Sequence, residues 1–150
     1  MSIHDKHKEA KFETEIVEYL TSKDWIEGTS SGYDKNLALY TEDLISYIKN
    51  TQSDAYEKMA KREGVKTDEV LANYVAKELD KEGSLYFLRR EIKYIGSKFK
   101  LCQFKPELDN PELQKKYDAN ILRIVRQVYY SNEDKSSIDL VLFLNGIPLA

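Results

Sequence analysis

Residues 121–130 and 138–148 read ILRIVRQVYY and IDLVLFLNGIP, and these two stretches decide the fold. The first is rich in β-branched and aromatic residues, and the second is an apolar run interrupted by Asp139. Both patterns predict β-strands, and a run that is apolar on both alternating faces is typical of a strand covered on both sides. Asn145-Gly146 predicts a two-residue hairpin, after which a third strand begins at Ile147.

Helices are predicted for most of the chain before these strands. Apolar side chains at helical spacing predict a first helix over residues 11–23, after a frayed tail of residues 1–8. Three further helices are predicted to begin at Thr41, as the N-cap, at Ser53 and at Thr67, and a fourth is predicted over residues 85–95. Residues 99–104 alternate like a short strand, and residues 111–118 predict a short helix with Pro at its first turn.

The predicted fold class is therefore α/β. We expect a restriction-endonuclease-like mixed β-sheet flanked by helices, within one domain fragment over residues 1–150. Residues 36–98 form a mostly helical segment before the sheet and carry no motif. Because the sequence stops at Ala150, inside the predicted third strand, we expect a fragment that is incomplete at its C-terminus.

Composition narrows the function classes. The net charge is −3, whereas a domain that holds DNA alone usually carries a basic excess, so a free-standing DNA-binding protein is disfavoured. The single cysteine excludes an internal disulfide. No targeting segment or membrane-length apolar run is present in the sequence, and we expect a cytoplasmic protein with no membrane partner.

Asp139 is the first candidate for chemistry. An ionised carboxylate within such an apolar strand is costly unless a cation or several hydrogen-bond donors accompany it. A divalent metal would satisfy it. Position alone also allows a structural role, in which Asp139 begins the strand half-exposed and bonds the turn at Ser136-Ser137.

The wider pattern is more specific. Residues 123–150 closely resemble the N-terminal domain of the restriction (R) subunits of type I restriction–modification enzymes, which belong to the PD-(D/E)XK nuclease superfamily. The shared elements are Val125-Arg126-Gln127, Tyr130, Ile138-Asp139-Leu140 and Phe143-Leu144-Asn145-Gly146-Ile147-Pro148.

The resemblance implies that Asp139 is a metal-binding, catalytic aspartate that holds Mg²⁺ for cleavage of double-stranded DNA. In such nucleases an E-x-K pair follows on the next strand, and by the family's spacing it would fall just beyond Ala150. We therefore expect the fragment itself to be inactive. In metal-assisted phosphodiester hydrolysis, carboxylates hold the cation, which polarises the phosphate and lowers the pKa of water.

Glu13 is a second candidate carboxylate. With a rotation of about 100° per residue along the predicted helix, Glu13 falls inside the apolar stripe that begins at Phe12. A Glu that faces inward is rarely buried without a partner, so a functional or paired role is expected. The stretch around it is similar to the first helix of archaeal Holliday-junction resolvases, in which the matching Glu approaches the metal site. The alternative is a Glu at the edge of the stripe that pairs with a cation.

Arg126 and Gln127 lie in the strand before Asp139, where one of them can approach the site or DNA. The alternative for Arg126, which the pattern favours slightly, is a buried Arg paired with an acid on a neighbouring helix. Lys93 and Lys135 can contact phosphate, but a solvated position suits each better. Cys102 is interpreted as a small core residue.

No Gly-x-x-x-x-Gly-Lys-Ser/Thr loop is present, so no ATP-binding residue is predicted here. The resemblance implies ATP-driven translocase modules elsewhere in the parent protein. It also implies the modification (methyltransferase) and specificity subunits as partners. The rival hypothesis is a non-catalytic module that docks a partner subunit, with Asp139 structural.

Overall fold

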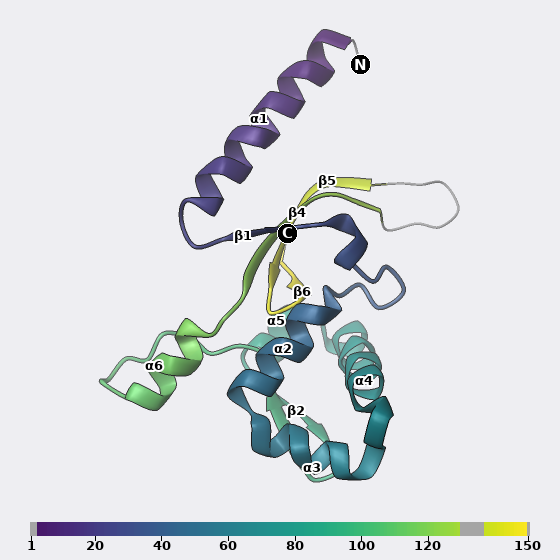
Figure 1. The fold of residues 1–150 in the computed structure, drawn as a ribbon, viewed down its shortest axis with the longest axis vertical. Coiled ribbons are helices and arrows are strands. Elements are labelled where there is room, and N and C mark those ends of the chain that lie inside the picture. The colour runs from purple at the N-terminus through teal and green to yellow at the C-terminus, as the bar shows by residue number, and fades with distance from the viewer. Residues whose placement is uncertain (1–2, 130–136, 150) are drawn as a thin grey trace.

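A computed structural model describes residues 3–129 and 137–149, with the backbone alone at residues 3–7, 9, 127–129 and 137–139. A mixed sheet lies between a long N-terminal helix and a helical body (Figure 1). The elements are α1 (Ile3–Thr21), β1 (Ile26–Gly28), η1 (Ser30–Gly32), α2 (Thr41–Thr51), α3 (Ser53–Glu63), η2 (Gly64–Lys66), α4 (Thr67–Glu82), α5 (Ser84–Leu88), β2 (Glu91–Tyr94), β3 (Ser97–Lys100), α6 (Pro111–Asp118), β4 (Leu122–Tyr129), β5 (Ser137–Leu144) and β6 (Ile147–Pro148).

The sheet has the order β1-β4-β5-β6. β4 and β5 form its long antiparallel pair, and they are the strands predicted over residues 121–130 and 138–144. β1 runs parallel to β4, with Ile26 opposite Arg123, which makes the sheet mixed. The predicted α/β class is confirmed. β1 was not predicted from the sequence, because a strand of three residues is too short to show an alternating pattern of apolar and polar side chains.

β5 is an interior strand, as its apolar run predicts, but its two faces differ. Val141 and Phe143 are buried against Tyr40 on one face, whereas Leu140 and Leu142 on the other are only half-buried. The predicted turn follows it, with positive φ angles of 51° at Asn145 and 83° at Gly146. A Cβ at Gly146 would overlap the backbone of Tyr40, so glycine is required there for space as well as for φ.

The helical body consists of α2 to α5 with the antiparallel pair β2–β3. It has its own apolar core, to which α2, α3, α4 and β3 contribute Leu44, Met59, Leu71 and Phe99. Ile147 of β6 is buried in the same core, so the sheet and the helical body share packing at that edge.

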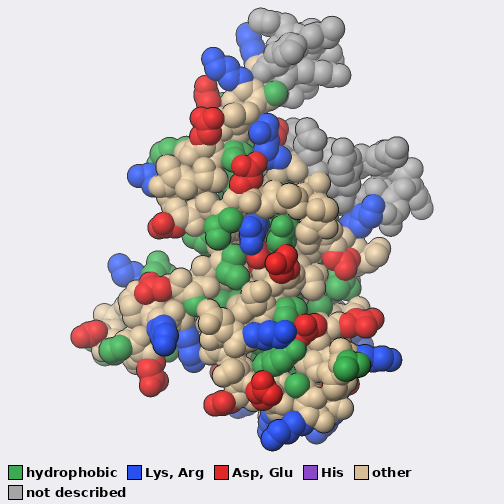
Figure 2. Space-filling model, viewed as in Figure 1, with side chains coloured by type: hydrophobic (Ala, Val, Ile, Leu, Met, Phe, Trp, Pro, Cys, Tyr) green, Lys and Arg blue, Asp and Glu red, His purple; other side chains and the backbone are tan. Residues whose placement is uncertain are grey.

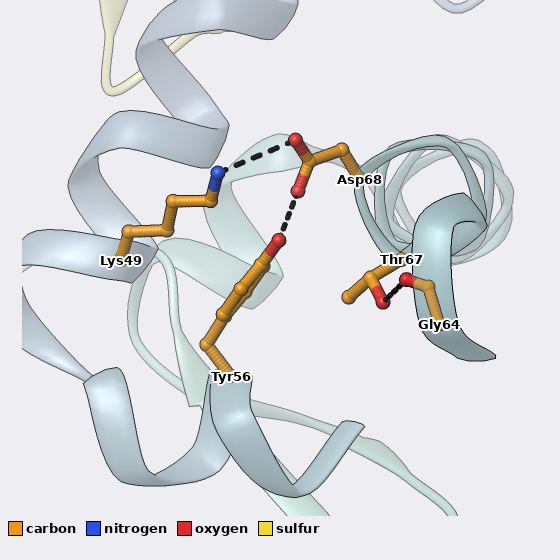
Figure 3. A network of polar contacts seen from close by, with 5 residues as sticks. All are labelled: Lys49, Tyr56, Gly64, Thr67 and Asp68. Carbon is orange, nitrogen blue, oxygen red and sulfur yellow. Dashed lines mark hydrogen bonds and ion pairs between the residues drawn. The ribbon is translucent and has the colours of Figure 1, made fainter. Parts of the chain in front are cut away.

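A polar network joins three helices of this body (Figure 3). Asp68, in the first turn of α4, receives a hydrogen bond from the Tyr56 hydroxyl of α3 and lies 3.4 Å from the Lys49 ammonium of α2. Burial, followed by the bond to Asp68, raises the pKa of Tyr56. Beside it, the buried Thr67 hydroxyl donates to the Gly64 carbonyl at 2.5 Å, which fixes the turn between α3 and α4.

Several predicted boundaries are wrong. The helix predicted over residues 85–95 ends at Leu88, and the later part of that range forms β2, which turns back into β3 at Ile95 and Gly96, both with positive φ angles. The strand predicted over residues 99–104 is shifted to Ser97–Lys100. α1 begins at Ile3, within the predicted tail, and Tyr40 rather than Thr41 is the N-cap of α2. Thr41 Oγ1 is buried without a hydrogen-bond partner among the described residues.

Candidate functional site on the central strand pair

Asp139 lies near the start of β5, between two residues whose backbone partners are known. Ile138 is opposite Val128 and Leu140 is opposite Arg126, so the backbone of Asp139 is fixed within the long strand pair. Its side chain lies outside the described residues, as do the side chain of Gln127 and the whole of residues 130–136, including Lys135. The role predicted for Asp139 therefore stays a prediction.

The face that α1 turns inward is centred on Glu13 and Val17. Val17 is buried, the Glu13 side chain is 12% exposed, and Phe12 is 66% exposed. The predicted stripe, which began at Phe12, is thus displaced around the helix. Glu13 lies closer to the middle of the contact with the sheet than the sequence indicated.

Glu13 is paired with Arg126. The Arg126 Nε donates a hydrogen bond to Glu13 Oε1 at 2.7 Å, and the Arg126 side chain is 34% exposed. The bond joins α1 to β4 across most of the chain. The structure therefore brings together two of the predicted site residues, in the pairing of Arg126 with a helix acid that the sequence favoured slightly.

This pairing limits what Glu13 can do. A carboxylate that neutralises a guanidinium is held by a charge-assisted hydrogen bond. It would have to leave Arg126, or share itself with it, in order to bind a metal ion. Among residues with described side chains, no group of three His, Cys, Asp or Glu is arranged to hold a metal ion, and that set does not include Asp139.

A second ion pair, which the sequence analysis missed, joins the helical body to the sheet. Arg123 of β4 binds Asp43 of α2 with two hydrogen bonds, of 2.9 Å from Nε and 2.7 Å from Nη2. Its guanidinium carbon lies 5.1 Å from the centre of the Tyr40 ring. The hydrogen bonds to Asp43 raise the pKa of Arg123. In the sequence, this pair is marked only by the acidic Asp43 in the first turn of a predicted helix. Its partner Arg123 is 80 residues away, so no local pattern connects the two.

Glycines make room for this pair. A Cβ at Gly28 would lie 2.5 Å from Cδ of Arg123 and 2.8 Å from the Tyr40 hydroxyl. A Cβ at Gly32 would overlap the Tyr40 ring. The close approach of β1 and η1 to Tyr40 and Arg123 therefore depends on small residues at both positions.

Asn145 has a structural role beyond its turn. Its side chain is fully buried, accepts a hydrogen bond from the Ile121 amide at 2.6 Å and donates to the Leu101 carbonyl at 2.9 Å. It also donates to the side chain of Asn120. The hairpin is thus tied to the segments that enter β4 and leave β3.

Cys102 is buried, as predicted, and its thiol lies 3.3 Å from the Leu88 carbonyl. Burial raises the pKa of this thiol, which disfavours the thiolate. Cys102 therefore packs as a core residue.

The family model described as Type I restriction enzyme R protein N terminus (HSDR_N) matches residues 6–150. The chain belongs to this family. It corresponds to the N-terminal region of the R subunit of a type I restriction enzyme, as the pattern over residues 123–150 indicated. Comparisons with curated proteins and with solved structures gave no match.

Membership assigns the chain to a subunit of a restriction enzyme, broadly a nuclease. The matched range includes α1 and the helical body as well as the central strand pair, so it extends well before the residues that carried the resemblance. No helix in the described part of the chain is long and apolar enough to cross a membrane.

Proposed function

We propose that this chain is part of the Mg²⁺-dependent, DNA-cleaving region of a type I restriction subunit, to which it contributes Asp139 as a metal-binding catalytic aspartate. The observation that carries the proposal is the family match over residues 6–150, together with the position of Asp139 in an interior strand of the sheet. The substrate would be double-stranded foreign DNA.

The donor chemistry at Asp139 fits Mg²⁺, which prefers carboxylate oxygens. When bound, the ion would polarise a phosphodiester and lower the pKa of a water molecule. Glu13 fits a second-ligand role less well, because its carboxylate already binds Arg126 at 2.7 Å. Glu13 would act as a second catalytic carboxylate only after its release from Arg126.

Arg126 and Gln127 are the proposed DNA contacts beside Asp139. Arg126 is partly exposed, so one face of its guanidinium can meet a phosphate while Nε stays on Glu13. Gln127 follows it in β4. The proposed partners of the parent protein are the modification and specificity subunits. ATP would be used by translocase modules and not by the residues of this chain.

The test is Asp139→Ala in the full-length R subunit, assembled with its partner subunits. We expect loss of DNA cleavage, with ATP hydrolysis and translocation retained. Asp109→Ala removes an exposed carboxylate from the loop before α6 and serves as the matched control. Cleavage that survives Asp139→Ala at the control level would contradict the proposal.

A second candidate function is a non-catalytic module that docks a partner subunit. Phe12 and Tyr19 lie about two turns apart on α1, and both are largely exposed, at 66% and 63%. Exposed aromatic side chains are typical of interfaces. If this function holds, Asp139→Ala leaves cleavage unchanged, whereas Phe12→Ser with Tyr19→Ser weakens co-purification of the other subunits.

A further inference from the structure

The outer face of the β2–β3 hairpin gathers positive charge in a chain whose net charge is negative. Residues 89–100 read RREIKYIGSKFK and contain five cations and one acid, while the whole chain has a net charge of −3. Elsewhere the two signs are interspersed, as over most of the face drawn in Figure 2. The five cations come from both strands of the hairpin and from the residues before β2.

Strand alternation puts the cations on one side. Ile92 and Phe99 point into the core of the helical body, whereas Lys93, Lys98 and Lys100 are exposed. Arg89 and Arg90, immediately before β2, are exposed as well. We name Arg89, Arg90, Lys93, Lys98 and Lys100 together the basic face.

Two observations set this face apart from an ordinary solvated surface. Lys93 and Lys98 are directly opposite each other in the register, an arrangement of like charges that destabilises a strand pair. None of the ion pairs between described side chains includes a member of the basic face. Lys93 and Lys98 therefore repel each other, and no ion pair between described side chains neutralises either of them.

A hollow adjoins the basic face. It has a volume of about 280 Å³, and its lining includes Arg89, Arg90, Lys100 and the acid Glu91. Glu91 is opposite Lys100 in the register and offsets part of its charge. Arg90 is held in place over the Tyr86 ring, with its guanidinium carbon 4.0 Å from the ring centre. Two arginines and one lysine therefore line the hollow against one acid.

We propose that the basic face binds the phosphate backbone of duplex DNA. The proposal rests on the proposed function, since it takes duplex DNA as the substrate. Alternate residues of a strand lie about 6.8 Å apart, and DNA presents a regular row of phosphates with one charge per about 3.4 Å of axis on each strand. The spacing of cations along a strand is thus about twice the axial spacing of the phosphates, so such a ribbon would meet alternate phosphates without reading bases. The contact would position the duplex, and sequence would be read elsewhere.

The test measures binding of the chain to a fluorescein-labelled duplex of random sequence by anisotropy over a salt series. EDTA is present, so that Mg²⁺-dependent cleavage plays no part. The variant combines Arg89→Gln, Lys93→Gln and Lys98→Gln. We expect the slope of log K against log salt to fall by about 0.9 for each phosphate contact removed, or about 2.7 for the three. The control combines Lys23→Gln, Lys35→Gln and Lys115→Gln, which remove the same charge from exposed positions off the hairpin, and should keep the wild-type slope.

Two further measurements separate a loss of DNA contacts from unfolding of the variant and from failure of the cleavage proposal. The urea midpoint of the basic-face variant should equal or exceed that of the wild type, because the repulsion between Lys93 and Lys98 is removed. Cleavage by the full-length subunit carrying Asp139→Ala is measured separately, so that failure of the cleavage proposal and failure of this one are distinguishable. Absence of salt-dependent binding by the wild-type chain overturns the proposal, as does a variant that keeps the wild-type slope. A variant that binds DNA normally but no longer retains the partner subunits also overturns it and assigns the face to an acidic protein surface.

Discussion

Arg123 and Asp43 form a bidentate ion pair that connects β4 to α2, with hydrogen bonds of 2.7 and 2.9 Å. Only 3% of the Asp43 side chain and 18% of the Arg123 side chain are exposed. Because the two charges are largely removed from water, each depends on the other for compensation. The pair also lies beside Tyr40, which packs on Phe143 of β5. The contact between the helical body and the sheet therefore centres on one buried charge pair.

Asp43→Ala should lower the free energy of unfolding by about 3 kcal/mol or more, because it leaves the Arg123 guanidinium buried without its partner. The matched control is Lys49→Gln, which breaks the exposed pair with Asp68 and should cost less than about 1 kcal/mol. Urea unfolding followed by circular dichroism measures both. Equal losses for the two variants would show that burial does not set the strength of the Asp43 pair.

Glu13→Gln and Arg126→Gln separate a structural pair from a metal ligand. If Glu13 acts only through Arg126, the two substitutions should be coupled by about 1 to 2 kcal/mol in a double-mutant cycle of unfolding. Both should then leave the Mg²⁺ affinity of the full-length subunit, measured by calorimetry, unchanged. A loss of Mg²⁺ affinity in Glu13→Gln but not in Arg126→Gln would instead identify Glu13 as a ligand.

Asn145→Ala should cost about 3 kcal/mol, since it removes the hydrogen bonds to Ile121, Leu101 and Asn120. It also forces a residue with a Cβ and no local polar group to adopt a φ of 51°. Asn145→Gly removes the same bonds but relieves the backbone, so it should be less damaging by about 1 kcal/mol. Equilibrium unfolding of the two variants checks the difference, and the reverse order would contradict this division of the cost.

The raised pKa of Tyr47 predicts that the folded protein loses stability at alkaline pH. Burial, followed by the nearby Cys102, raises the pKa of Tyr47 to about 12, from 10.0. Above pH 10 the unfolded chain releases this proton while the folded chain keeps it, so stability is full below pH 10 and is lost as the pH rises toward 12. Tyr47→Phe should flatten this decline by up to about 1.4 kcal/mol per pH unit.

Urea unfolding at intervals from pH 9 to pH 11.5 measures the effect. Tyr33, Tyr56, Tyr74 and Tyr94 also have raised pKa values, so the variant should retain part of the decline. Identical slopes for Tyr47→Phe and the wild type would exclude Tyr47 as a contributor.

The elements that the sequence predicted well are those that a local pattern specifies. β4 and β5 follow from their apolar runs, the β5–β6 turn follows from Asn145-Gly146, and α6 follows from Pro111. Residues 85–95 misled, because Leu85, Leu88, Ile92 and Ile95 also fit a helical repeat. The helix ends at Leu88, and Glu91–Tyr94 instead pairs with β3 through a turn at Ile95-Gly96, where Ile adopts a positive φ that it rarely takes.

The sequence identified individual residues of the candidate site, but it did not show which of them contact one another. The sequence selected Glu13 and Arg126 separately, and only the parallel placement of β1 beside β4 brings α1 close enough for them to meet. Asp43 and Arg123 gave no signal of comparable strength, since an acid in the first turn of a helix usually needs no partner beyond the helix end. Long-range pairing is what local patterns cannot specify.

The placement of β1 next to β4 also bears on how the chain is made. The partners of Ile26 and Glu13 are in β4, so they leave the ribosome roughly one hundred residues later, a delay of about 5 to 20 s at ordinary rates of synthesis. During that interval the helical body, whose helices are neighbours in sequence, can already fold. The contact between the N-terminal helix and Arg126 therefore forms only after β4 has been synthesised.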